Sequence, residues 1–199
     1  MTDSSIDFSI VPCSLGRMLV AATARGVCYV AFADEERELY ERLAARFPFA
    51  APERDDVRRK PWVERLVAYV DGFAARLDVP LDVGGTRFQR DVWAALRRIP
   101  RGRTRTYGEI AADLGRVRGA RAVARACAAN PVAVAIPCHR VVPAAGGAGG
   151  YAWGAARKRA LLAREGASLD AGSDPGRRLG EGSDPGGRLG EASDPSCQR

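Results

Sequence analysis

The sequence contains a single histidine, His139, which directly follows Cys138, one of five cysteines, in the stretch IPCHRVV. A thiolate is a strong nucleophile, and an imidazole can accept the proton of a thiol near neutral pH. However, a cysteine in apolar surroundings is more often an inert buried thiol, and a lone histidine is more often structural. The residue types therefore allow nucleophilic chemistry at Cys138 without establishing it.

The order of these residues indicates how a proton could move. The β-branched run VAVAI ends at Pro137, which restricts the preceding residue to extended geometry, so we expect a strand-like segment up to Cys138. Neighbouring side chains on an extended chain point in opposite directions, which disfavours a direct Cys138–His139 ion pair. A relay through a bridging water fits better, with a carboxylate orienting the far imidazole nitrogen. Glu165 is the only acidic residue between positions 113 and 170, and it is the candidate for that carboxylate.

The net charge of +7 is distributed unevenly along the chain. Residues 1–85 carry 11 basic and 14 acidic side chains, and residues 168–199 carry 4 and 6. Residues 86–167 carry 16 basic and 4 acidic side chains, a net charge of +12. Such an excess suits a polyanion, because each arginine near a phosphate releases a condensed counterion. Nearly all of these cations are arginine, which a GC-rich genome also favours, so the charge favours nucleic-acid binding without proving it.

The composition also excludes several classes of protein. No run of eighteen or more apolar residues predicts a membrane span, and the first residues do not resemble a secretory signal. Five scattered cysteines without a CxxC pair favour a reducing cytosol over a disulfide framework. One histidine and dispersed cysteines cannot supply the ligand pairs of a zinc site. We therefore expect a cytoplasmic protein that contacts no membrane and holds no metal.

Residues 1–85 are predicted to form a small domain with an antiparallel sheet and helices. The apolar runs MLVAAT and VCYVAFA flank a short segment that ends in Gly26, which predicts a hairpin, and residues 8–11 are a candidate third strand. Apolar residues at helical spacing predict amphipathic helices over 35–47 and 62–77.

Residues 86–169 are predicted to form a second, mostly helical domain. A helix is predicted over 88–99. A short helix is then expected to start after Thr106, a candidate N-cap with Glu109 three residues later, which is the pattern of a capping box. A second helix over 119–129 follows after a short turn and is stopped by Asn130-Pro131. Two short helices joined in this way form a helix-turn-helix or a generic helical hairpin, and the local positive charge favours DNA binding.

Residues 170–199 form a low-complexity array in which GSDPGRRLGE recurs as GSDPGGRLGE with a period of ten. A segment so rich in Gly, Pro, Ser and Asp cannot bury a core, so we expect a disordered tail.

These features resemble the O6-alkylguanine-DNA alkyltransferases, for which PCHRV is a highly specific motif. The resemblance covers residues 86–167 strongly and residues 1–85 more loosely, and it is strongest to the C-terminal repair domain of the bacterial adaptive-response protein. Besides IPCHRVV, it includes Thr86-Arg87-Phe88-Gln89, Thr106-Tyr107, Arg121-Ala122-Val123, Ala128-Ala129-Asn130-Pro131, Tyr151-Ala152-Trp153-Gly154 and Glu165. It implies an α+β fold with a ribonuclease H-like N-terminal domain, then a mostly helical domain with a helix-turn-helix and the disordered tail.

The resemblance implies a suicide DNA repair enzyme, a methyltransferase that needs no cofactor. Cys138 would take the alkyl group from guanine O6, and also from thymine O4, in one irreversible step. His139 would be the water-mediated base and Glu165 the carboxylate that orients it. Asn130 would brace the turn between the recognition helix and the active site.

The implied partner is double-stranded DNA that contains alkylated guanine, bound by a monomer. Tyr107 would donate to guanine N3, and Arg121 would enter the duplex and fill the gap left by the flipped base. The slim recognition helix would enter the minor groove. The further predicted DNA contacts are Ala120, Ala122, Arg125 and Arg140, and the predicted pocket residues are Val141, Tyr151, Ala152 and Trp153.

Other interpretations remain for individual residues and for the function. Tyr107 could only pack, Arg121 could only contact phosphate, and Glu165 could only be a charge at a helix end. Trp93 and Trp153 suit the core better than a base-stacking platform. A non-catalytic lesion-binding module and a cysteine hydrolase are the alternative functions, and the first would not need Cys138.

Overall fold

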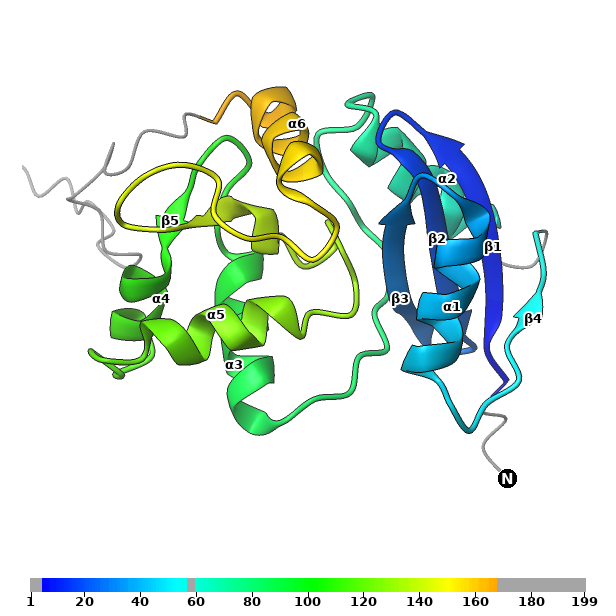
Figure 1. The fold of residues 1–199 in the computed structure, drawn as a ribbon, viewed down its shortest axis with the longest axis horizontal. Coiled ribbons are helices and arrows are strands. Elements are labelled where there is room, and N and C mark those ends of the chain that lie inside the picture. Colours follow the sequence, from blue (N-terminus) through cyan, green and yellow to red (C-terminus); the bar gives the residue numbers. More distant parts are fainter. Residues whose placement is uncertain (1–4, 57–59, 168–199) are drawn as a thin grey trace, which may run out of the picture.

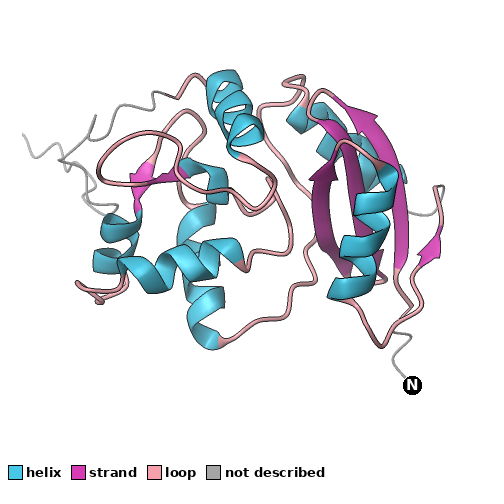
Figure 2. Cartoon of the chain, viewed as in Figure 1, coloured by secondary structure: helices cyan, strands magenta, loops and turns pink. Residues whose placement is uncertain are grey.

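The computed structural model describes residues 5–56 and 60–167, and within them the chain has an α+β fold. A sheet with two helices forms the N-terminal part, and the C-terminal part beside it is mostly helical (Figures 1 and 2). The predicted tail, residues 170–199, lies outside the described residues. None of the helices in the described ranges has the length and hydropathy needed to cross a membrane.

The N-terminal part is built on a four-stranded sheet of order β3-β2-β1-β4. Strands β1 (Asp7–Cys13), β2 (Gly16–Thr23) and β3 (Gly26–Ala33) form an antiparallel meander, and β4 (Glu53–Arg54) pairs in parallel with β1. The predicted hairpin and its third strand are therefore confirmed. Gly26 has a φ of 157° at the start of β3, and a Cβ there would lie 2.6 Å from Pro80 O, so only glycine fits.

Two helices pack on this sheet, and one of them is shorter than predicted. Helix α1 (Glu36–Arg46) contacts β2 and β3 and agrees with the predicted range of 35–47. Helix α2 (Lys60–Val70) contacts β1 but ends seven residues before the predicted residue 77. Gly72, two residues after the end of α2, adopts a φ of 87°, which stops the helix. Phe73 is 86% exposed instead of lying on the apolar face.

The C-terminal part begins with α3 (Arg87–Arg97) and continues through β5 (Arg105–Thr106), α4 (Tyr107–Asp113) and α5 (Ala120–Ala128). The predicted capping box is confirmed: Thr106 accepts from the Glu109 amide, and Glu109 accepts from the Thr106 amide. A 3-10 turn η1 (Cys138–Arg140), β6 (Val141–Val142) and α6 (Ala155–Glu165) complete this part. Strands β5 and β6 pair in parallel and tie the start of α4 to the chain that follows η1.

The segment before Cys138 is a turn, and the predicted strand is wrong. Val132 forms only an isolated bridge with Val30 on the edge of β3, through the Val30 amide to Pro131 O at 2.9 Å. The chain then reverses at Val134, whose φ of 59° is rare for a β-branched residue. The left-handed conformation of Val134 therefore interrupts the run after a single bridge, despite its local β propensity. The bridge joins the loop before Cys138 to the N-terminal sheet.

Candidate functional site

Cys138 lies at the first position of the 3-10 turn η1 and is 5% exposed. Successive side chains in a 3-10 helix are about 120° apart, so Cys138 and His139 still point away from each other, although the chain is not extended. Burial raises the pKa of the Cys138 thiol, whereas a hydrogen bond from Asn130 and the nearby charge of Lys158 lower it part of the way. The thiol therefore stays protonated in the free protein and needs a proton acceptor before it can attack.

Asn130 connects the end of α5 to the thiol. Its Nδ2 donates to Cys138 Sγ at 3.2 Å and to Ile136 O at 2.8 Å. Its Oδ1 accepts from the Val132 amide at 3.0 Å. These three contacts span both ends of the turn, so the side chain fixes the loop that presents Cys138.

The predicted pairing of His139 with Glu165 is present in the structure. Their side chains are 0% and 3% exposed, and His139 Nε2 lies 3.1 Å from Glu165 Oε1. Burial alone would raise the pKa of Glu165, but hydrogen bonds from His139 and Arg140 hold it well below its usual range. Because the carboxylate is ionised, Nε2 carries the proton and donates. That leaves Nδ1 as an acceptor, and this buried atom has no hydrogen-bond partner among the described residues.

Arg140 was predicted to contact DNA, and the structure corrects this prediction. The residue is 7% exposed, and its Nε and Nη2 donate to the two oxygens of Glu165, each at 2.8 Å. Its Nη1 donates to Ile99 O and its Nη2 to Tyr69 Oη, both at 2.6 Å. With its donors engaged inside the protein, the guanidinium is a structural partner of the carboxylate.

Two further residues at the site were not identified from the sequence. Lys158 on α6 is 1% exposed and donates to Val141 O at 2.6 Å. Burial lowers the pKa of Lys158, while Cys138 and Cys127 raise it part of the way. Tyr69 on α2 donates to Glu165 Oε1 at 3.2 Å. A signal existed for each: Lys158 lies on the apolar face of its helix together with Leu161 and Leu162, and the hydroxyl of a buried tyrosine needs a polar partner.

Tyr107 is the first residue of α4 and is half-buried near the thiol. Burial, and then the proximity of Cys127 and Cys138, raises its pKa to about 12. The hydroxyl is therefore neutral near pH 7 and available as a donor.

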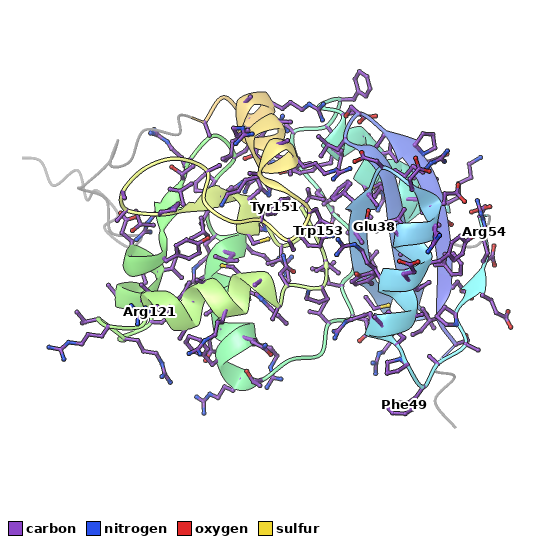
Figure 3. All side chains as sticks on the ribbon, in the orientation of Figure 1. Glu38, Phe49, Arg54, Arg121, Tyr151 and Trp153 are labelled. Atoms are coloured by element: carbon purple, nitrogen blue, oxygen red, sulfur yellow. The ribbon has the colours of Figure 1, made fainter. Side chains whose placement is uncertain are left out.

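Helix α5 presents its predicted contact residues in different ways. Arg121 and Arg125 are exposed, and Arg121 lies near the end of α5 that is farthest from the sheet (Figure 3). Ala120 and Ala122 are half-buried. The exposed face of this helix therefore combines arginine cations with small side chains, which allows close approach of a phosphate backbone.

The predicted pocket residues follow η1 and precede α6. Val141 is buried, Ala152 is exposed, and Tyr151 and Trp153 stack edge to face with ring centroids 5.0 Å apart (Figure 3). Trp153 also packs against Phe32 of β3, at 6.3 Å between centroids, which agrees with the expected core role. Trp93 is likewise buried, and its Nε1 donates to Ala126 O at 2.9 Å.

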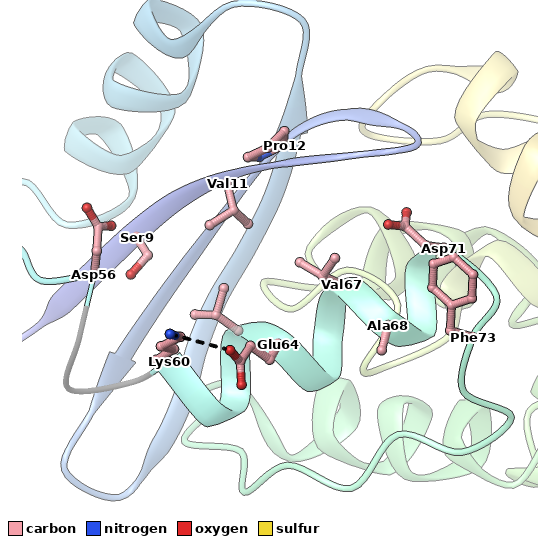
Figure 4. Close-up of a pocket in the computed structure, with 11 residues that line it drawn as sticks. Ser9, Val11, Pro12, Asp56, Lys60, Glu64, Val67, Ala68, Asp71 and Phe73 are labelled. Carbon is pink, nitrogen blue, oxygen red and sulfur yellow. Dashed lines mark ion pairs between the residues drawn. The ribbon is translucent and has the colours of Figure 1, made fainter.

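A hollow of about 590 Å³ lies elsewhere, between β1 and α2 (Figure 4). Its lining includes Ser9, Val11 and the ion pair between Lys60 and Glu64. None of the predicted site residues lines it, so it is separate from the thiol and its partners.

The chain matches known proteins over most of its length. Residues 87–167 match the family model described as 6-O-methylguanine DNA methyltransferase, DNA binding domain. A methylated-DNA–protein-cysteine methyltransferase of Methanosarcina acetivorans is 38% identical over 159 residues, which cover 80% of this chain and 97% of the relative. The chain belongs to the methylated-DNA–protein-cysteine methyltransferase family.

Other members of this methyltransferase family extend the comparison. The bifunctional transcriptional activator and DNA repair enzyme Ada of Escherichia coli is 42% identical over 161 residues, 81% of this chain. The chain spans 46% of the length of that relative. A crystal structure of Mycobacterium tuberculosis OGT in complex with DNA has a TM-score of 0.67 and 35% identity, and the match covers 81% of this chain and 92% of that one.

Proposed function

We propose that this chain repairs DNA by transferring the alkyl group of O6-alkylguanine to Cys138, once per molecule and without a cofactor. The observation that carries the proposal is the contact of Asn130 with the thiol beside the buried His139–Glu165 pair. Family membership supplies the substrate class. The same reaction with O4-alkylthymine is part of the proposal, as are a monomeric state and a cytoplasmic location.

The proton of the thiol leaves through a bridging water to Nδ1 of His139, the acceptor without a partner. Glu165 stabilises the imidazolium that forms, since its carboxylate faces Nε2. The thiolate then attacks the alkyl carbon, the bond from that carbon to O6 breaks, and the electron pair moves into the guanine ring. Tyr107 donates to N3 and so stabilises the negative charge on the leaving base. The thioether that forms on Cys138 is stable and does not release the alkyl group, so each protein molecule reacts only once.

Reaction at O6 requires the base to leave the stack, because the atom is not accessible inside the duplex. Helices α4 and α5 act as the helix-turn-helix, with α5 in the minor groove and Arg121 occupying the space of the flipped base. The exposure of Arg121 and the small side chains of α5 support this placement. Val141, Tyr151 and Ala152 line the base pocket. The N-terminal part is ribonuclease H-like, which the strand order β3-β2-β1-β4 supports.

The test compares Cys138→Ser with the matched control Cys127→Ser, which changes a second buried cysteine at the site. The wild type and Cys127→Ser should remove O6-methylguanine from a duplex until one lesion per protein molecule is lost. Cys138→Ser should remove none and should still bind the duplex. Lesion removal by Cys138→Ser, or removal beyond one equivalent by the wild type, would contradict the proposal.

A further inference from the structure

The N-terminal part contributes a side chain to the buried network around Glu165. Tyr69 belongs to α2, whereas Glu165 ends α6 and Arg140 lies in η1. The Tyr69 hydroxyl accepts from Arg140 Nη2 at 2.6 Å and donates to Glu165 Oε1 at 3.2 Å. A residue 96 positions away in sequence therefore completes the surroundings of the carboxylate.

The oxygen that Tyr69 contacts is the same oxygen that faces His139. Glu165 Oε1 accepts from Tyr69 Oη, from Arg140 Nη2 at 2.8 Å and from His139 Nε2 at 3.1 Å. A carboxylate oxygen offers about two lone-pair sites, and three donors share Oε1, so the donors compete for the charge on that atom. The hydroxyl of Tyr69 thus competes with the imidazole for the charge on Oε1.

We infer that Tyr69 is a positioning residue for alkyl transfer: its hydroxyl sets how strongly Glu165 holds the His139 imidazole and thereby couples the relay to docking of the N-terminal part. This inference rests on the proposed function of His139 as the base. A cavity of about 440 Å³, whose lining includes Tyr69, Ile99 and Arg140, borders the network. On that side Arg140 is held by the Tyr69 hydroxyl and by Ile99 O.

The direction of the effect follows from the charges that face the imidazole. Glu165 and Lys158 act on it from α6, and Arg140 acts on it from η1. Burial lowers the pKa of His139, and Glu165 raises it, whereas Arg140 and Lys158 lower it. Removing the Tyr69 donor leaves more charge on Oε1 for the imidazole, so the pKa of His139 should rise.

The experiment uses Tyr69→Phe in the full chain, with Tyr40→Phe as the matched control. Tyr40 is also a tyrosine of the N-terminal part whose hydroxyl accepts from an arginine, Arg54 at 3.1 Å, but it lies on α1. Because the chain has one histidine, the nitrogen NMR signals of His139 can be titrated without ambiguity. In Tyr69→Phe the midpoint should rise by about half a unit. Because a more basic imidazole accepts the thiol proton more readily, the transfer rate at saturating DNA should rise, by at most about threefold for half a unit.

A ring-fluorinated tyrosine at position 69 provides a second variant, which keeps the hydroxyl and donates more strongly. It should move the His139 midpoint downward, opposite to Tyr69→Phe. Tyr40→Phe should change neither the midpoint nor the rate. Unchanged midpoints in both variants at position 69 overturn the inference. The titration needs no alkyl transfer, so an inactive wild type would refute the proposed function without affecting this readout.

Discussion

Asn130 Nδ2 donates to Cys138 Sγ at 3.2 Å and thereby links the end of α5 to the proposed acceptor thiol. The same amide group holds Ile136 O, and the side-chain oxygen accepts from the Val132 amide. A rotation of α5 on DNA would therefore be transmitted to the thiol through one side chain. The contact gives Asn130 both an electrostatic and a structural effect, and the two can be measured separately.

Asn130→Ala should raise the pKa of Cys138, because the hydrogen bond from Asn130 lowers it. The pH dependence of Cys138 alkylation by iodoacetamide, followed on its peptide by mass spectrometry, measures this shift. Cys127 in the same sample is the internal reference. Leaving the Val132 amide unpaired should also cost about 1–3 kcal/mol of unfolding free energy. An unchanged pH profile would show that Asn130 does not act on the thiol.

Glu165→Gln should lower the unfolding free energy by about 3–5 kcal/mol at neutral pH, because it leaves the buried Arg140 without its carboxylate. The folded pKa of Glu165 lies below its unfolded value. Its contribution is therefore present above about pH 4.3 and is lost as the pH falls below it. The difference in unfolding free energy between Glu165→Gln and the wild type should become smaller at acid pH. Denaturant unfolding at several pH values measures it. Glu64→Gln, which changes an exposed ion pair, should have almost the same unfolding free energy as the wild type. A loss of unfolding free energy in Glu165→Gln that does not depend on pH would contradict the account.

Lys158→Met should slow alkyl transfer, because the charge of Lys158 lowers the pKa of Cys138. The pH at which the transfer rate rises should therefore be higher in this variant. Methionine keeps an unbranched chain in the same space, so the variant removes the cation together with its hydrogen bond to Val141 O. Single-turnover rates between about pH 7 and about pH 11 measure the shift, because burial raises the pKa of the Cys138 thiol above its usual value of about 8.5. Arg159→Met removes a cation from an exposed neighbour on the same helix and should leave this pH unchanged. If both variants shift the pH dependence of the transfer rate equally, the effect comes from net charge and not from the position of Lys158 beside Cys138.

Arg121→Ala should reduce repair of a paired lesion by about tenfold or more, since extruding the base costs a few kcal/mol that the inserted side chain offsets. Reaction with free O6-benzylguanine should stay within about twofold, because no flipping is needed. Arg37→Ala removes the same charge from an exposed site on α1 and controls for net charge. Equal losses with duplex and free base would refute the proposed insertion.

The sequence correctly predicted the elements that depend on residues close together in the chain. The capping box at Thr106 and the hairpin at Gly26 depend on residues within a few positions of each other, and both are confirmed. The predicted strand before Cys138 failed because the edge of β3 and the left-handed Val134 impose a turn. The overlong helix failed at Gly72, where the conformation of one residue outweighed continued apolar spacing.

The contacts of the site also differ in how far the sequence could predict them. The pairing of His139 with Glu165 could be predicted because the chain has one histidine and few acidic residues nearby in sequence. Arg140 was misassigned because a charge next to a motif in a basic region suggests DNA, whereas its partners come from α6, α2 and the loop after α3. Partners so distant in sequence leave no periodic signal.

The most direct test of the central claim is the mass of the Cys138 peptide after incubation with a duplex containing O6-methylguanine. The account predicts that this peptide alone gains the mass of one methylene group, in proportion to the lesions lost, while the Cys13, Cys28 and Cys127 peptides do not change. An unmodified Cys138 in folded protein that has bound the duplex would contradict it.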